Sequence, residues 1–482
     1  MSIFRKKSLA SLFAQLNDKG ADTLKRTLDA KSLIALGIGA IIGAGLFVRT
    51  AAAAGEAAGP GVTLSFMLAA LGCTFAGLCY AEFAAMIPIA GSAYTYAYCT
   101  MGEFVAWIIG WALVLEYALG AATVSIAWSE YLNNLLGGAI PYQWCHSPLE
   151  TSTTGMHGIF NVPAIFILLL LTLLLIKGTQ ESATVNAVIV FLKVAIVLVF
   201  IGIGWQFINP ANHTPYLIPA GTLGHEGFFQ HGWGGMVRGA SIVFFAFIGF
   251  DAVSTAAQEA KNPGRDMPIG ILGSLVICTV LYILFGHVLT GVANWSEFQV
   301  AGKEASVAYA IQKYMIGYGW LGTLVTVAIL AGFSSVILVM LLGQSRVFYS
   351  MAKDGLLPKL FSELHPKFRT PYKSNWVLFV FVGAFAGLLP GSLAGDLTSV
   401  GTLFAFALVS AGVMIMRKTD PDQPRPFRTP LVPIVPILGV VICSGLIISV
   451  DTTTQLTAAA WMLIGFVIYF LYSKSHSKLA GE

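Results

Sequence analysis

Long apolar runs alternate with short polar segments along the whole chain. A helix needs roughly 20 mostly apolar residues to cross the roughly 30 Å of hydrocarbon in a membrane. Runs that meet this requirement lie near residues 32–56, 61–87, 101–132, 160–176, 184–208, 236–258, 268–293, 317–350, 374–389, 392–416, 430–450 and 455–473. The pattern therefore predicts an all-α integral membrane protein with twelve transmembrane helices.

The amino-acid composition excludes an ordinary soluble protein. Of the 482 residues, 56% are hydrophobic and 10% are charged, whereas soluble domains carry about 25% charged residues. A soluble fold has no place for so much apolar surface, and a bilayer requires it. We divide the chain into a cytoplasmic N-terminal segment (1–31), spans 1–6 of a membrane core (32–258), spans 7–10 of that core (259–416), and two last spans with a cytoplasmic C-terminal tail (417–482).

The basic residues predict the orientation of the chain. An even number of spans puts both termini on one side; 22 of the 27 Lys and Arg residues fall on that side, four on the other and one within a span. Because basic residues collect in cytoplasmic loops, we expect a plasma-membrane protein with both termini in the cytoplasm. The first thirty residues are polar and basic, so we expect no cleavable signal peptide. They form either a helix on the inner membrane surface or a disordered tail.

Two of the apolar runs are interrupted. Gly37, Gly39, Gly43 and Gly45 fall within nine positions of span 1, and each glycine weakens a helix by about 1 kcal/mol relative to alanine. The run 244–251 in span 6 contains a glycine and an aspartate. Interrupted helices five spans apart are typical of transporters built from inverted repeats. Close helix packing through a GxxxG pattern would explain the glycines of span 1, but not their pairing with a second irregular segment.

A pair of broken helices suits an amino acid as substrate. An unwound segment leaves free N–H groups at the start of one half-helix, and these attract a carboxylate. It also leaves free carbonyl groups at the end of the other half-helix, and these accept hydrogen bonds from an ammonium group. An amino acid presents both charges close together, so paired breaks match its head group without any charged side chain.

Five short motifs occur in an order typical of one family. They are Gly43-Ala44-Gly45 in span 1, the segment 88–96 after span 2, the segment 259–268 after span 6, the segment 351–358 after span 8 and the segment 425–430 before span 11. With these motifs the chain resembles the amino acid–polyamine–organocation (APC) superfamily, and within it the bacterial relatives of the cationic amino acid transporters. The resemblance covers nearly the whole chain, and five motifs in order are far more specific than any one of them.

This resemblance implies a leucine-transporter-type fold, in which five spans and an inverted repeat of five precede two accessory spans. It implies that the substrate carboxylate meets the amides of the Gly43-Ala44-Gly45 signature, chiefly those of Ala44 and Gly45. It also implies that the substrate amine meets the carbonyls of Ile41, Phe245 and Ile248. The ring of Phe245 would then act as an aromatic gate over the substrate.

Lys193 is the one basic residue within a span. If span 5 begins near residue 184, the lysine lies roughly 13 Å inside the span at the helical rise per residue. A charged lysine on the lipid face is unfavourable, so its side chain should point into the bundle, where a lysine can act in proton exchange. The resemblance implies a lysine that replaces a coupling sodium ion and touches the unwound part of span 1. The alternative is a lysine that snorkels to the headgroups or is permanently paired.

Four further residues are candidates for proton coupling or substrate selection. Glu116 lies in the middle of span 3, where the resemblance implies an acidic residue that supports transport; otherwise it is a structural partner for a buried polar group. Asp251 follows the break in span 6 and either relays protons or caps the second half-helix. Ser334 and Ser335 lie in span 8, which lines the side-chain subsite in relatives. Their small size leaves room for a long substrate, unless they only bond back to their own helix.

These observations predict a proton-coupled symporter that imports L-amino acids by alternating access. The expected substrates are small neutral amino acids such as alanine, and the resemblance adds cationic ones such as arginine and lysine. Sodium-coupled symport and exchange of one amino acid for another stay open as rivals. The sequence has no channel filter and no P-loop, HExxH or GxSxG motif, so we expect no enzyme activity, cofactor, bound metal or nucleic-acid partner. It leaves open whether an accessory single-span subunit or a sterol binds.

Overall fold

The computed structural model describes residues 5–7, 28–87, 92–152, 154–178, 183–299 and 306–481. The described residues form helices joined by turns and loops, and their only extended pairings are two isolated bridges, Leu28 with Ala260 and Thr151 with His157. This architecture confirms the predicted all-α class. The segment for which a surface helix or a tail was expected lies almost wholly outside the described residues, which begin again at residue 28.

The helices coincide with the apolar runs of the sequence. In the described part of the chain, eight helical segments are long and apolar enough to cross a membrane: Gly45–Met86, Glu103–Leu135, Val188–Phe207, Gly232–Ser254, Pro263–Val292, Gly319–Lys353, Gly391–Thr419 and Thr452–His476. Four shorter apolar helices accompany them: Ala30–Ile41, Val162–Lys177, Tyr372–Leu388 and Ile434–Ile448. The chain is therefore a multi-pass helical membrane protein.

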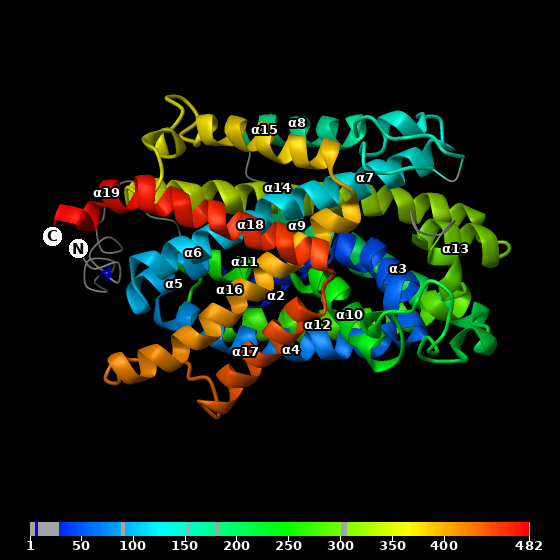
Figure 1. Cartoon of the computed structure of the whole chain (residues 1–482), viewed down its shortest axis with the longest axis horizontal. Helices are drawn as coiled ribbons and strands as arrows, with labels where there is room; N and C mark the ends of the chain where they lie inside the picture. The colour runs from blue at the N-terminus through cyan, green and yellow to red at the C-terminus, as the bar shows by residue number, and fades with distance from the viewer. Residues whose placement is uncertain are drawn as a thin grey trace.

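Figure 1 labels the helices along the chain. Their bounds are α2 Ala30–Ile41, α3 Thr50–Ala53, α4 Val62–Met86, α5 Ser92–Thr100, α6 Glu103–Val114, α7 Gly120–Leu135, α8 Val162–Lys177, α9 Ala183–Gly204, α10 Gly232–Phe244, α11 Ala252–Thr255, α12 Pro263–Val292, α13 Ser306–Tyr314, α14 Gly319–Lys353, α15 Tyr372–Leu388, α16 Gly391–Thr419, α17 Ile434–Ile448, α18 Thr452–Ile468 and α19 Lys474–His476. Helix α2 lies inside the bundle, packed against α9, α11, α12 and α14, whereas α8 and α15 pack together along one edge (Figure 1).

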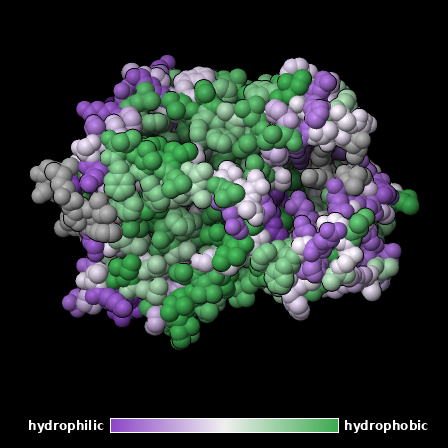
Figure 2. Space-filling view, viewed as in Figure 1, coloured by the Kyte–Doolittle hydropathy of each residue, from purple (hydrophilic) through white to green (hydrophobic). Residues whose placement is uncertain are grey.

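The outer surface is unusually apolar for a folded protein. Large hydrophobic side chains on several helices are strongly exposed, including Phe191 (74%), Val276 (62%) and Val380 (66%). Figure 2 shows a broad hydrophobic band across the visible face, with hydrophilic residues gathered toward the two ends of the molecule. An apolar surface of this extent is a membrane surface, because soluble proteins expose only small apolar patches.

The start of α2 is tied to the segment that follows α11. Asp29 caps α2, because its carboxylate accepts the Ser32 N–H at 2.9 Å. Just before it, the Leu28 N–H donates to the Glu259 carbonyl at 2.9 Å, and the Lys261 N–H donates to the Leu28 carbonyl at 2.8 Å. The start of span 1 and the 259–268 motif are therefore joined directly by backbone hydrogen bonds.

The 425–430 motif has a structural role. Glu82, near the C-terminal end of α4, is buried and receives two hydrogen bonds from the Arg417 guanidinium at 3.0 and 2.8 Å. Arg425 adds an ion pair at 3.3 Å, and the Thr429 N–H donates to the same carboxylate at 2.7 Å. A buried carboxylate requires such partners, so this motif holds the loop before α17 against α4.

Candidate functional site

Span 1 is interrupted where the glycine signature predicts it. Helix α2 ends just before Ile42, which is extended (φ −73°, ψ 106°), and a π-helical segment begins at Gly45. In the half of span 1 that follows the break, the first hydrogen bond is donated by the Leu46 N–H to the Gly43 carbonyl, at 3.1 Å. The N–H groups of Gly43, Ala44 and Gly45 therefore precede the first donor of this half-helix, which is the arrangement that attracts an anion.

Span 6 is interrupted between α10 and α11. Residues Phe245–Phe247 form a tight turn, Ile248 has ψ 135°, and Gly249 has φ 113°, a conformation that glycine adopts far more readily than other residues. The Ile248 N–H donates to the Phe245 carbonyl at 3.3 Å. A carbonyl oxygen has two lone pairs, so the Phe245 carbonyl can still accept a second donor. Both Phe245 and Ile248 are buried.

The two interrupted segments touch through glycine. A Cβ atom at Gly45 would lie 2.2 Å from the Cα of Ala246, and a Cβ atom at Gly249 would lie 2.8 Å from the carbonyl oxygen of Ala40. No real side chain fits at such distances. Glycine at these two positions therefore brings the backbones of spans 1 and 6 into direct contact, so that the ends of four half-helices meet at one place.

A tyrosine that the sequence analysis missed joins the two breaks. Tyr282 of α12 is fully buried, and its hydroxyl lies 3.1 Å from the Ile41 carbonyl oxygen and 2.9 Å from the Ala246 carbonyl oxygen. One hydroxyl proton serves one carbonyl at a time, so the two carbonyls share a single donor. A lone tyrosine inside the apolar stretch 280–286 was the available signal, because a buried tyrosine hydroxyl needs a partner.

Lys193 points into the bundle and contacts span 1. Its Nζ donates to the Gly39 carbonyl at 2.8 Å, and the residue is 2% exposed. Gly39 belongs to the last turn of α2 before the break. On the other side, a Cβ atom at Gly332 of α14 would meet the Cε of Lys193 at 2.9 Å. The lysine stem therefore lies in a space that exists because Gly332 has no side chain.

Glu116 and Asp251 lie side by side in the core, and both are fully buried. Glu116 belongs to a π-helical segment, residues 115–119, and such segments inside α-helices are frequent at functional sites. The Tyr117 hydroxyl donates to Asp251 Oδ2 at 2.6 Å. Asp251 precedes α11, but its side chain makes no capping hydrogen bond of ordinary geometry, although the Ala252 N–H lies near its carboxylate. The geometry thus ties Asp251 to span 3 more firmly than to its own helix.

Helix α14 lines the break in span 1 from the side. A Cβ atom at Gly43 would lie 3.1 Å from a methyl group of Val336, one residue after Ser335, which is 3% exposed. The Ser334 hydroxyl donates to the Leu330 carbonyl at 2.9 Å. The alternative interpretation, that a serine bonds back to its own helix, is therefore correct for Ser334.

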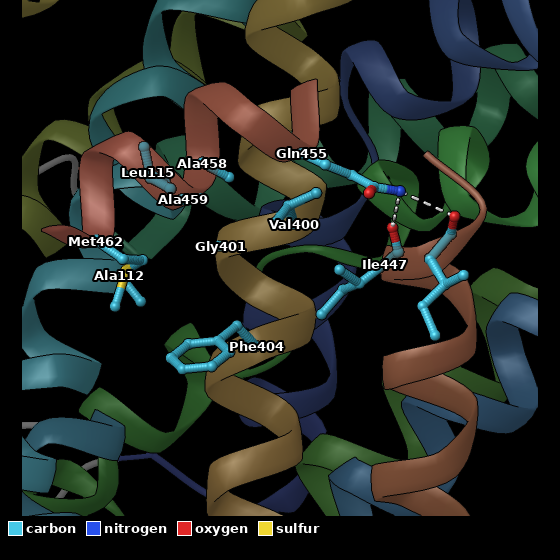
Figure 3. Close-up of a pocket in the computed structure, with 11 residues that line it drawn as sticks. Ala112, Leu115, Val400, Gly401, Phe404, Ile447, Gln455, Ala458, Ala459 and Met462 are labelled. Atoms are coloured by element: carbon cyan, nitrogen blue, oxygen red, sulfur yellow. Dashed lines mark hydrogen bonds between the residues drawn. The ribbon is translucent and has the colours of Figure 1, made fainter. Parts of the chain in front are cut away.

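A separate cavity of about 240 Å³ lies between α6, α16, α17 and α18 (Figure 3). Its lining is apolar apart from Gln455, and none of the predicted site residues lines it. The Gln455 amide already donates to the carbonyls of Ile448 at 2.9 Å and Val450 at 2.8 Å. A cavity without charged or free polar groups does not fit a zwitterion, so we place the candidate site at the helix breaks instead.

Ion pairs close the bundle at the half of span 1 that follows the break. Arg49 and Arg238 both pair with the carboxylate of Asp396 on α16, and Arg238 also lies 3.7 Å from Asp451. The side chains of Arg49 and Asp396 are 3% and 6% exposed. The sequence analysis placed Arg49 and Arg238 on the outer side but did not pair them with an acid, because the partners are more than 150 residues apart.

Contacts between the chain ends close the opposite end of the bundle. The Lys7 ammonium pairs with Asp354 at 2.7 Å, and the Tyr94 hydroxyl donates to the same carboxylate at 2.9 Å. The Arg5 guanidinium donates to the Leu479 carbonyl at 2.6 Å. Asp354 belongs to the 351–358 motif, so that motif anchors the chain ends to the end of α14.

These features define a class of protein: a multi-pass helical membrane transporter in which two interrupted helices meet inside the bundle. The chain belongs to the amino acid permease family, whose sequence profile matches residues 28–475. This confirms the resemblance inferred from the five motifs.

Three relatives illustrate the breadth of the family. The chain is 43% identical over 481 residues to the branched-chain amino acid permease BcaP of Bacillus subtilis (strain 168), with 99% of each chain covered. It is 40% identical over 483 residues to the methylthioribose transporter of the same organism, again with 99% of each chain covered. It is 37% identical over 428 residues to the chloroplastic cationic amino acid transporter 9 of Arabidopsis thaliana, covering 87% of this chain and 72% of that protein.

Proposed function

We propose that the chain is a secondary transporter that imports L-amino acids together with protons by alternating access. The observation that carries this proposal is the contact between the two interrupted helices, Gly45 against Ala246 and Gly249 against Ala40. Family membership supports an amino acid as substrate, and the contact supplies backbone groups of both signs at one buried place.

The proposed topology has twelve membrane spans. Helix α2 and the first part of the segment Gly45–Met86 form span 1, α4 in the rest of that segment forms span 2, and each of the other ten apolar helical segments forms one span. The two interrupted spans hold equivalent places in two inverted sets of five, and α17 and α18 are the accessory spans. An even number of spans requires both chain ends on one side, and the hydrogen bond between Arg5 and Leu479 supports this. The excess of basic residues at that side favours a plasma-membrane protein with cytoplasmic termini.

In the proposed complex the two breaks hold the head group of the substrate. The N–H groups of residues 43–45 receive the carboxylate, and the carbonyls of Ile41, Phe245 and Ile248 receive the ammonium group. The Phe245 ring closes over the substrate. Water is excluded from this buried place, so hydrogen bonds to charged groups are strong there.

Proton coupling is assigned to Lys193, with Glu116 and Asp251 as a second titratable group. A charged Lys193 holds the Gly39 carbonyl at the end of α2. A neutral amine is a weaker donor than an ammonium, so proton loss releases the inner half of span 1 to move. The lysine also argues against sodium coupling, because its ammonium occupies a place that an ion would need.

The surroundings of the breaks favour aliphatic substrates. Ile41, Phe245, Ile248 and Val336 are apolar and buried, which suits side chains from alanine to the branched amino acids named for BcaP. Ser335 leaves room for longer, cationic side chains, which are the second substrate class. One relative is named for the transport of methylthioribose. This thio-sugar is therefore the alternative substrate, and it belongs to a different chemical class.

Uptake into proteoliposomes tests the proposal. Labelled alanine, leucine and arginine should accumulate under an inward proton gradient without sodium, and methylthioribose should not. Lys193→Ala should abolish accumulation, whereas Lys313→Ala, at a lysine whose side chain is 49% exposed, should leave it unchanged. A sodium requirement with an active Lys193→Ala variant contradicts proton coupling. A strict requirement for amino acid inside the vesicle indicates exchange, and uptake of methylthioribose alone contradicts the substrate class.

A further inference from the structure

Buried hydroxyl groups gather around the Glu116–Asp251 pair. Tyr80 of α4, Tyr96 of α5 and Ser254 of α11 are each at most 1% exposed. Within the described residues, these hydroxyl oxygens, both carboxyl oxygens of Glu116 and one of Asp251 lack a hydrogen-bond partner of ordinary geometry. Only looser contacts join Tyr96 to Ser254 and Glu116 to Asp251 and Thr402. Buried polar atoms in folded proteins almost always have a partner, either protein or ordered water. Six such atoms around one acid pair therefore need an explanation.

These groups are neighbours and not merely a scattered set. Tyr80 interacts electrostatically with both acids, and Tyr96 interacts with Asp251 and lies beside Ser254. The ring centroids of Tyr80 and Tyr96 are 6.4 Å apart. Together with the two acids, the three hydroxyls form one polar region inside an apolar bundle.

The other groups near the acid pair are neutral as well: they are hydroxyls and the backbone N–H groups of Gly249 and Ala252, which lie beside Asp251. Tyr117 donates to Asp251 Oδ2, and Thr402 of α16 lies beside Glu116. The Thr402 hydroxyl already donates to the Thr398 carbonyl at 3.0 Å. The groups that face the pair from α4, α5, α11, α16 and the 115–119 segment are therefore neutral. Two adjacent buried carboxylates without a positive neighbour are the arrangement in which one proton is shared.

Helix α5 connects this polar region with the end of the molecule that holds the termini. Tyr94 of α5 donates to Asp354, which also binds Lys7. Two residues further along, Tyr96 stacks on Phe83, with ring centroids 5.3 Å apart, and lies close enough to Asp251 to interact with it electrostatically. One short helix thus carries a hydroxyl toward each region. Helix α19 lies at one end of the bundle (Figure 1), and the hydrogen bond between Arg5 and Leu479 brings the first described residues to that end as well.

We propose that Tyr80, Tyr96 and Ser254 hold internal water against the Glu116–Asp251 pair, and that Tyr96 passes the coupled proton from this pair to the cytoplasmic side. Water fits these atoms because it both donates and accepts hydrogen bonds, and buried waters usually make about three of them. This inference rests on the proposed proton symport and deepens it, by assigning the step in which the proton leaves.

The proton step is balanced at every atom. The protonated acid pair gives its proton to a bridging water, and that water gives one of its own protons to the hydroxyl oxygen of Tyr96. Tyr96 in turn gives its original hydroxyl proton to a second water molecule on its cytoplasmic side, which passes it on to the cytoplasm, and rotation of the hydroxyl resets Tyr96. The pair loses one proton, the cytoplasm gains one, and no group is oxidised or reduced.

Tyr96→Phe is the direct test, because it removes one oxygen and keeps the ring that stacks on Phe83. Purified protein in proteoliposomes is assayed in two ways with the same labelled amino acid: net uptake under a proton gradient, with internal acidification read by a pH dye, and exchange against internal amino acid. Exchange of the loaded carrier does not require proton release, whereas net uptake does. Net uptake by Tyr96→Phe should fall at least fivefold while exchange stays within twofold of wild type.

Two further variants separate this role from a structural one. Ser254→Ala should also lower the ratio of net uptake to exchange, but by a smaller factor than Tyr96→Phe does. Tyr94→Phe removes a hydroxyl from the same helix on the Asp354 side, and should leave the ratio of net uptake to exchange unchanged. An unchanged ratio in both Tyr96→Phe and Ser254→Ala overturns the inference. Uptake by the wild-type protein without internal acidification would overturn the proposed proton symport itself. This outcome is distinct from an unchanged ratio in the variants, which overturns only the role of Tyr96.

Discussion

Gly45 has the least room for a side chain among the predicted site residues. The distance of 2.2 Å from an added Cβ to the Ala246 backbone is far below any van der Waals contact, and the obstacle is main chain that cannot rotate away. Gly43, two residues earlier, faces only a side-chain methyl group at 3.1 Å. The two glycines of the signature are therefore not equivalent: one is required for the contact between spans and the other is not.

We predict that Gly45→Ala lowers amino acid uptake at least tenfold, because the two breaks are forced apart. The measurement is initial uptake rate in proteoliposomes, corrected for the amount of folded protein. Gly202→Ala is the matched control, since a Cβ there meets nothing within 4 Å, and it should retain wild-type uptake. Equal activity of Gly45→Ala and wild type would show that the breaks do not need to touch.

Sequence reasoning reached most of the candidate site because backbone breaks leave a mark in composition. Glycine is the residue that marks both breaks, and Lys193 is conspicuous because a charge inside an apolar run has few explanations. Tyr282 and Asp396 were missed for the same physical reason: each acts through a partner more than 100 residues away. Local pattern does not encode such pairings.

At the scale of elements, the apolar runs predicted which segments are helical but not how the helices are wound. The π-helical segments 45–49, 54–58 and 115–119 arise from shifts in the hydrogen-bond ladder that composition does not reveal. The 425–430 motif was predicted as a family marker. The structure adds its physical basis, which is the neutralisation of the buried Glu82 by two arginines.

We predict that Glu82→Gln destabilises the protein by about 3 kcal/mol, because loss of one partner leaves buried arginine charge without compensation. Thermal unfolding of detergent-solubilised protein is the measurement. Glu363→Gln breaks the ion pair with Lys373, in which both side chains are more than a third exposed, and should change stability by at most about 1 kcal/mol. Equal midpoints for the two variants would contradict the structural role of the motif.

At the scale of the whole molecule, charged contacts stand at both ends of the bundle, with the helix breaks between them. Arg49, Arg238 and Asp396 form one contact, which is the outer one in the proposed topology, and Lys7 with Asp354 forms the other, inner contact. The proposed alternating access requires that each contact opens while the other is closed. Neither contact involves the predicted substrate-binding groups, so each can be changed without removing the site.

We predict that Asp396→Asn opens the outer side. A cysteine introduced at Ala51, which is fully buried in α3, should then react at least threefold faster with a membrane-impermeant maleimide from outside. The six native cysteines are buried and supply the background rate. Lys7→Ala, at the inner end, should leave the outer reaction unchanged or slower. A faster reaction in Lys7→Ala than in Asp396→Asn would reverse the assignment of the two ends.

The central claim is that backbone groups at two helix breaks grip the two charges of an amino acid. Binding of an L-amino acid to purified protein should be compared with binding of its methyl ester, which lacks the carboxylate, and of its N-acetyl derivative, which lacks the ammonium group. We predict that each derivative binds at least 100-fold more weakly than the parent amino acid, whichever aliphatic side chain is used. Binding of either derivative within about threefold of the parent would contradict the claim, because a site that recognises only the side chain would not need the breaks.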